Sequence, residues 1–287
     1  MHYVQAKSIL SASNGMNLYR GCQHGCIYCD ARSLCYQMNH VFEDIEVKDN
    51  AIELLEAALK AKRKPSMIGT GAMTDPYIPL EMKLGMTRKA LELISKHGFG
   101  IAIQTKSNRI LRDIDLLEQI NRQAKAVVQM TLTTYDEDLC RILEPKVSTT
   151  RQRFDALCCF RDAGIPTVVW LCPILPFIND TEENLLGILE LCAQAEVKGV
   201  IYFGAGLTLR DGNREYFYTK LDRHFPGLKQ KYIRTYGNAY EIPSPNKVML
   251  DSLFHHFCQE RGIWHDNDQI FSYLHRLDDK ESQMTFF

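Results

Sequence analysis

The sequence predicts an α/β fold in which helices cross over between the strands of a parallel sheet. Short apolar runs alternate with longer amphipathic segments from near residue 16 to near residue 204. This alternation is typical of βα units, and roughly six of them fit into that span. They are too few for a closed eight-unit barrel, so an open six-unit barrel and a doubly wound sheet both fit the pattern. After Leu207 the alternation stops, which indicates a helical extension.

The first units are defined by apolar faces and by breaker residues. Ile52, Leu55 and Leu59 recur at helical spacing, and Pro65 stops that helix. Gly98 follows the next helix as a C-terminal cap. In order, we expect a strand near 16–20, a helix over 50–64, a strand over 66–70, a helix over 82–97, a strand over 100–105 and a helix over 110–123.

The later units repeat the pattern. Thr181 or Asp180 suits a helix N-cap, with Glu182 and Glu183 in the first turn. We expect strands over 126–132, 166–171 and 200–204, with helices over 150–163 and 181–195. In the helical extension, residues 211–225 are aromatic and charged, residues 228–236 form a basic amphipathic stretch, and a helix is expected over 246–261. We therefore divide the chain into a barrel domain, 1–206, and a helical extension with a flexible tail, 207–287.

Composition is that of an ordinary globular protein, with 287 residues, 45% hydrophobic content, 24% charged content and a formal net charge of −1. No apolar run reaches the roughly 18 residues that a membrane span needs, so we expect no membrane association. Met1–Lys7 lacks the apolar segment of a signal peptide, and ten cysteines suit a reducing compartment. We therefore expect a cytoplasmic protein.

One part of the extension carries a local basic surplus. Between Leu207 and Lys247 there are eight Lys or Arg and four Asp or Glu residues, with tyrosines interleaved. Charge and stacking of this kind are typical of nucleic-acid binding. A solvated helical surface is the commoner origin of such a run, and both interpretations stay open.

The most specific motif is a group of three cysteines, Cys22, Cys26 and Cys29, with the spacing C-x3-C-x2-C. Three thiolates hold three irons of a four-iron cluster and leave the fourth iron open. Structural zinc sites usually pair two tight units, and no second tight Cys or His pair follows here. Buried or zinc-binding cysteines are the alternative. Gly21 and Gly25 are expected to let the backbone wrap closely around the cluster.

Polar residues follow the predicted strands, where ligands bind in parallel α/β folds. Asp75 can receive an ammonium group or cap a turn, and Lys106 can pair with a carboxylate or lie on the surface. Further along come Thr131, Thr133, Leu143-Glu144-Pro145, Arg153 and Cys172.

In this order the segments resemble the radical S-adenosylmethionine (SAM) superfamily, and its spore-photolyase-like branch in particular. The resemblance spans roughly residues 14 to 205 and is carried by Arg20-Gly21-Cys22, His24-Gly25-Cys26-Ile27-Tyr28-Cys29, Thr74-Asp75-Pro76-Tyr77, Thr105-Lys106-Ser107 and Leu143-Glu144-Pro145. It implies an open (β/α)6 partial TIM barrel with a C-terminal helical extension. It also implies a [4Fe-4S] cluster on Cys22, Cys26 and Cys29, with SAM on the open iron.

The resemblance also implies a SAM pocket. The loop with Thr74 and Asp75 takes the part of the amino-binding motif, and Lys106 and Thr131 contact the SAM carboxylate or ribose. Other residues that we place at the cofactor are Tyr28, Thr133, Glu144 and Arg153. The hydrogen-donating cysteine of spore photolyase has no counterpart here, because that position is Ala72. Cys172, at a strand end, is the substitute that we expect to face the site, and Tyr77 is the second catalytic candidate.

The implied activity is reductive cleavage of SAM to a 5′-deoxyadenosyl radical, which abstracts hydrogen from a substrate. A nucleic acid, as in DNA repair, is the first interpretation, and modification of RNA or a peptide is the second. An iron–sulfur binding or electron-transfer protein without SAM chemistry is the rival from another class. The expected partner is a one-electron reductant of the flavodoxin or ferredoxin type.

The C-terminus offers a second link to DNA. Gln283-Met284-Thr285-Phe286-Phe287 resembles the short peptide that docks bacterial repair and replication proteins into the sliding clamp. Packing of the two phenylalanines on the protein's own core is the alternative.

Overall fold

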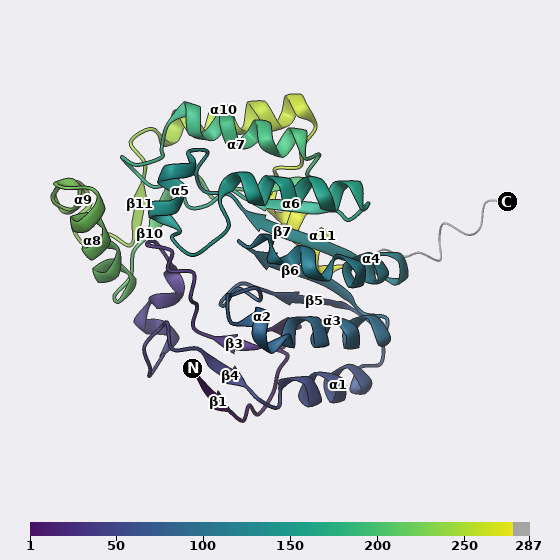
Figure 1. The fold of residues 1–287 in the computed structure, drawn as a ribbon. Coiled ribbons are helices and arrows are strands. Elements are labelled where there is room, and N and C mark those ends of the chain that lie inside the picture. The colour runs from purple at the N-terminus through teal and green to yellow at the C-terminus, as the bar shows by residue number, and fades with distance from the viewer. Residues whose placement is uncertain (278–287) are drawn as a thin grey trace.

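The computed structural model describes residues 1–277, and its centre is a six-stranded parallel sheet (Figure 1). The strands follow one another in chain order: β2 (Gly15–Met16), β5 (Met67–Thr70), β6 (Gly100–Thr105), β7 (Ala126–Thr131), β8 (Thr167–Trp170) and β9 (Gly199–Ile201). A doubly wound sheet reverses its strand order at a switch point, so the unbroken order excludes that alternative. The sheet does not close on itself, which confirms the open partial barrel.

The crossover helices cover one face of this sheet (Figure 1). They pack there because each buries an apolar stripe, as Leu55, Leu91 and Leu157 do, against strand residues of the main hydrophobic core. The helices are α1 (Ala51–Ala61), α3 (Met86–Lys96), α4 (Ile114–Gln123), α6 (Thr150–Asp162) and α7 (Glu182–Gln194).

The first expected strand, near 16–20, is wrong in its pairing. Only Gly15–Met16 joins the barrel sheet, beside β5. The next two residues turn the chain away, and β3 (Tyr19–Arg20) pairs with β4 (Glu46–Lys48) in a separate three-stranded sheet with β1 (His2–Val4).

The expected helix over 82–97 is two helices, α2 (Glu81–Leu84) and α3. They are separated by Gly85, whose φ of 63° is in the left-handed region. The helix expected from residue 110 begins as a 3-10 segment, Asn108–Asp113, and becomes α4. Two further helices, α5 (Glu137–Leu143) and α11 (Asn267–His275), were not predicted, although Asp136 and Asp266 cap them with hydrogen bonds to backbone N–H groups.

The extension packs on several sides of the barrel. Strands β10 (Gly206–Thr208) and β11 (Glu241–Pro243) form an antiparallel pair, and α8 (Asn213–His224) and α9 (Leu228–Tyr236) lie between them in the chain. Helix α10 (Lys247–Arg261) lies along α7 (Figure 1) and shares the main core. The division at residue 206 stays a prediction. Within residues 1–277, no helix combines the length and the apolar character that a membrane crossing requires.

Helix α11 covers the concave face of the sheet, opposite the crossover helices. Ile270 and Leu274 are buried there against Met67, Ala102 and Val127 in a hydrophobic cluster of their own. These strand residues alternate with those that face the main core, as the two-residue period of a strand requires. Helix α11 therefore covers the amino-terminal part of the concave face, and the polar side chains that follow the strands lie at the other end.

We expect Ile270→Ala to lower the free energy of unfolding by roughly 2–4 kcal/mol, because it leaves a void under the concave face. Ile270 is 0% exposed. The control is Ile233→Ala at a 46% exposed position, which should change stability by less than about 0.5 kcal/mol. Urea unfolding of both variants provides the measurement, and equal effects would contradict the packing of α11.

Candidate functional site

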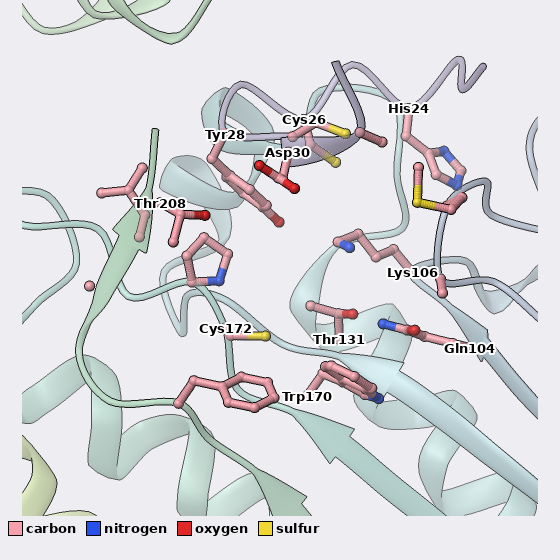
Figure 2. Close-up of a pocket in the computed structure, with 18 of the residues that line it drawn as sticks. His24, Cys26, Tyr28, Asp30, Gln104, Lys106, Thr131, Trp170, Cys172 and Thr208 are labelled. Atoms are coloured by element: carbon pink, nitrogen blue, oxygen red, sulfur yellow. The ribbon is translucent and has the colours of Figure 1, made fainter. Parts of the chain in front are cut away.

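A cavity of about 640 Å³ lies at the carboxyl ends of the barrel strands (Figure 2). Its walls are the cysteine loop, the ends of β5 to β9, and the β10–β11 pair. Of the residues predicted for the site, it gathers Cys22, Cys26, Tyr28, Cys29, Asp75, Lys106, Thr131 and Cys172. Segments more than a hundred residues apart in the sequence thus meet in one chamber.

The three cysteines of the motif all face this cavity as free thiols. Burial raises the pKa of Cys22 to about 12 and also raises the pKa values of Cys26 and Cys29. Unassisted, these thiols stay protonated, so they need a bound cation to become thiolates.

The spacing of the sulfur atoms favours a cluster over a single ion. Among residues 1–277, the three sulfurs are not part of any group whose ligand atoms all lie within 4.8 Å of one another. Thiolates on one tetrahedral zinc sit about 3.8 Å apart, given Zn–S bonds of about 2.3 Å. At least one pair of these sulfurs is wider apart than that, which suits separate irons of a four-iron cluster.

Backbone contacts fix the cysteine loop from two sides. The Ile27 N–H donates to the Leu143 carbonyl at 2.9 Å, and the Cys22 N–H donates to the Phe42 carbonyl at 3.1 Å. Gly21 has a φ of 87°, and a Cβ there would lie 2.5 Å from that Phe42 carbonyl oxygen. Gly21 is therefore required by a close approach to neighbouring protein, and its part in wrapping the backbone around a cluster stays a prediction.

The Asp75 carboxylate joins this loop to the ends of two strands. Oδ1 accepts hydrogen bonds from the Tyr77 N–H at 2.8 Å and from the Thr105 hydroxyl at 2.7 Å. Oδ2 accepts from the Lys106 N–H at 2.8 Å and makes an ionic contact with His24 Nε2 at 3.0 Å. Burial alone would raise the pKa of Asp75, but His24 and these hydrogen bonds outweigh it and lower that pKa to about 2.

These four contacts occupy the carboxylate's acceptor positions. Asp75 is therefore built to position the cysteine loop, and the contact with an ammonium group that we expected from its carboxylate stays a prediction. Its neighbour Thr74 is buried but does not line the cavity.

Lys106 and Thr131 present polar groups to the cavity that have no partner in the described part of the chain. Lys106 extends its ammonium group into the cavity (Figure 2), and no hydrogen bond or ion pair to Nζ occurs within the described part of the chain. Burial opposes its charge, but Cys26, Glu144 and Asp75 outweigh that effect and raise its pKa. The hydroxyl of Thr131, which is 1% exposed, has no hydrogen-bond partner among residues 1–277. A cation and a buried hydroxyl without partners in that range indicate that the cavity binds a polar, anionic ligand group.

Behind the cavity wall lies a buried polar network. Glu144 accepts hydrogen bonds from Tyr28 and pairs with Arg153, and Thr133 donates to Glu144 at 3.2 Å. Arg153 also donates to the Thr131 carbonyl at 2.7 Å. Burial would raise the pKa of Glu144, but Arg153 and Lys106 lower it. Glu144, Arg153 and Thr133 do not line the cavity, so they act on it through Tyr28 and Thr131.

Tyr77 lies outside the cavity, in contrast to the catalytic role that we expected. It is 0% exposed, and its hydroxyl donates to Asp113 at 3.0 Å beneath the crossover helices. The other catalytic candidate, Cys172, does line the cavity. Burial raises the pKa of its thiol to about 11, against a lowering effect of Lys106, so it keeps its hydrogen at neutral pH.

Several residues of the cavity were not predicted. Gln104 and Trp170 precede Lys106 and Cys172 by two positions, so strand periodicity places them on the same face. That signal was available in the sequence. Phe203, Glu241 and Lys247 also line the cavity, but they come from segments that only tertiary packing brings to the site.

Comparison with known proteins identifies the family to which the sequence is similar. The model described as the radical SAM superfamily matches residues 16–192. An uncharacterized protein of Mycobacterium tuberculosis strain H37Rv is 30% identical over 244 residues, which cover 82% of this chain and 70% of the relative. An uncharacterized protein of Methanocaldococcus jannaschii is 30% identical over 181 residues, or 62% of this chain and 67% of the relative.

Solved structures agree in fold. A spore photoproduct lyase variant superposes with a TM-score of 0.66 at 13% identity and covers 91% of this chain and 79% of its own. A second variant, with bound AdoMet and dinucleoside spore photoproduct, gives a TM-score of 0.63 at 14% identity, with 88% and 75% covered. This likeness concerns the fold, whereas the family rests on the sequence match. The chain therefore belongs to the radical SAM superfamily, whose members use a [4Fe-4S] cluster and S-adenosylmethionine.

Proposed function

We propose that this protein is a radical SAM enzyme that cleaves SAM reductively and abstracts hydrogen from a nucleic-acid substrate. One observation carries the proposal: a single cavity combines three free thiols, an unpaired lysine, an unpaired threonine hydroxyl and a separate protonated thiol. A protein that only stores or passes electrons through a cluster has no use for the last three groups.

Each group has a part in this proposal. Cys22, Cys26 and Cys29 hold the cluster, which, together with SAM and one electron, supplies the 5′-deoxyadenosyl radical. Lys106 pairs with the SAM carboxylate, and Thr131 bonds its ribose or carboxylate. The backbone of the loop around Asp75 takes the SAM amino group. Tyr28, held by Glu144 and Thr133, fixes the wall beside the cysteines.

Cys172 is the proposed hydrogen donor. After a hydrogen atom leaves the substrate, a substrate or product radical remains that must regain one. The Cys172 S–H bond supplies that atom and leaves a thiyl radical, which one electron from the reductant and one proton return to the thiol. The cavity includes Ala72 at the position where spore photolyase carries its donor, so Cys172 takes the part from the end of another strand, β8.

Two observations support a nucleic-acid substrate: the basic charge of α8 and α9, and the likeness of the fold to that of spore photoproduct lyase. Helices α8 and α9 carry six Lys or Arg against two acidic residues, and they are inserted between two strands that wall the cavity. The fold resembles that of spore photoproduct lyase, one structure of which contains a dinucleoside spore photoproduct. Modification of RNA or of a peptide is the competing proposal.

Radical SAM enzymes in general need an electron donor, and we propose a flavodoxin or ferredoxin for this one. The proposed clamp-binding segment, Gln283–Phe287, lies outside the described residues and stays a prediction from sequence.

The test of the enzyme class is an anaerobic assay. The cluster is reconstituted, SAM and dithionite are added, and 5′-deoxyadenosine is measured by chromatography. We expect 5′-deoxyadenosine to form at a rate set by the enzyme concentration. A stable four-iron cluster with no 5′-deoxyadenosine under any reductant would favour the electron-transfer alternative.

We expect Cys26→Ala to abolish both the four-iron absorption and 5′-deoxyadenosine formation, because two protein thiolates hold the cluster poorly. The matched control is Cys159→Ala, at an exposed cysteine on α6. It should retain both signals. Iron content and the visible spectrum after reconstitution are the measurements, and a full cluster in Cys26→Ala would remove Cys26 from the ligand set.

We expect Lys106→Met to weaken SAM binding by about 30-fold or more while the cluster still assembles. A desolvated charge contact of this kind is worth on the order of 2–5 kcal/mol. Anaerobic calorimetry on the reconstituted enzyme gives the dissociation constant. Lys83→Met, outside the cavity lining, serves as the control. Equal SAM affinity in wild type and Lys106→Met would place Lys106 elsewhere in the reaction.

A further inference from the structure

We infer that the cavity receives one nucleobase of its substrate on an aromatic floor in which Trp170 and Phe203 face the cavity and Phe271 supports both rings. This inference rests on the proposed function and names the moiety that this site takes. It follows from the ring geometry, from a free amide beside the rings, and from the position of the floor relative to Thr131 and Cys172.

The aromatic floor is preorganised. The Trp170 ring centroid lies 6.1 Å from that of Phe203 and 5.8 Å from that of Phe271. Phe203 and Phe271 stack on each other at 6.4 Å with an interplanar angle of 27°. Trp170 is fixed further, because its indole N–H donates to Gln129 Oε1 at 2.9 Å. A rigid set of rings binds a planar ligand with little entropic cost.

Despite this packing, the floor is open to ligand. Phe203 lines the cavity and is 60% exposed, which is unusual for a phenylalanine held by two other rings. A smaller cavity of about 250 Å³ adjoins on the side of Trp170 and Phe271. The two cavities share Ala72, Gln104 and Trp170, so space for a planar ring continues past the main chamber.

The aromatic floor lies near Cys172, the proposed hydrogen donor, and is separate from the polar groups that are proposed to bind the cofactor. Thr131 pairs with Trp170 across neighbouring strands, so the floor begins one strand away from the proposed ribose or carboxylate contact. Figure 2 shows Lys106, Thr131, Cys172 and Trp170 pointing into the same chamber. A ring placed on Trp170 and Phe203 therefore has the Cys172 thiol within the same chamber, as a hydrogen donor requires.

Gln104 supplies the edge contact. Its side chain lines both cavities, and its amide forms no hydrogen bond within residues 1–277. A carboxamide offers one acceptor and two donors, which match the adjacent donor and acceptor groups on the edge of a nucleobase. Stacking on aromatic rings combined with an amide at the edge is the usual means of holding an unpaired base.

The experiment uses the tryptophan of the floor as the probe. The chain contains two tryptophans, Trp170 and Trp264, and Trp264 contacts Tyr273 and Lys198 outside the cavities. In reconstituted, SAM-loaded Trp264→Phe enzyme, emission therefore reports on Trp170 alone. The titrants are thymidylyl-thymidine, uridylyl-uridine, an abasic dinucleotide analogue and a tetrapeptide without aromatic residues.

We expect both base-containing dinucleotides to quench Trp170, and the abasic analogue and the peptide to leave it unchanged. A preference between the two dinucleotides tells DNA from RNA. Phe203→Leu should weaken the dinucleotide by roughly tenfold, and Phe203→Tyr should restore it. Tyr3→Leu, at a 53% exposed ring outside the cavity, should have no effect.

Formation of 5′-deoxyadenosine by the wild-type enzyme in the absence of dinucleotide separates the inference from the enzyme class. Loss of SAM affinity in Phe203→Leu would assign the ring to the cofactor and overturn the inference. So would quenching by the peptide alone, or no quenching by either dinucleotide while SAM cleavage proceeds.

Discussion

The arrangement of the site depends on one buried carboxylate. Asp75 receives three hydrogen bonds and one ionic contact, from His24 in the cysteine loop, from its own loop after β5 and from the end of β6. Unpaired, a charge in this position would be costly, and shared among four donors it becomes a fixed point. The cysteines, the carboxyl ends of the strands and Lys106 take their positions relative to it.

The division of the sheet into two faces decides what the cavity contains. Crossover helices bury one face in the main core, and α11 covers the amino-terminal part of the other. The main cavity opens at the strand ends on the concave face, where the alternate positions carry Gln104, Lys106, Thr131, Trp170 and Cys172. A closed eight-unit barrel would fill this interior with its own side chains. The open barrel leaves room for both a cofactor and a substrate.

Much of this could be read from the sequence, and the failures have physical causes. The central strands and crossover helices were predicted because periodicity and breakers act locally, as at Pro65 and Thr181. The first strand failed because Tyr19 pairs with Val47, a contact distant in sequence. The cysteine motif and Lys106 were predicted from spacing. The burial of Tyr77 under Arg112 and the aromatic floor were not, since both depend on tertiary contacts that no local pattern encodes.

The antiparallel pair β10–β11 determines how the lobe formed by α8 and α9 can vary among related enzymes. Its two strands keep their register against each other, while everything between them, including α8 and α9, is attached at the tip. Chain inserted at such a tip adds little closure entropy and leaves the flanking backbone in place. The inner face of α8 and α9 is nevertheless tied to the cysteine loop, because Phe217, Tyr218 and Tyr232 share a hydrophobic cluster with Cys26, Ile27 and Tyr28. Only the outer surface of these two helices is therefore free to change in length or charge without disturbing the residues proposed to hold the cofactor.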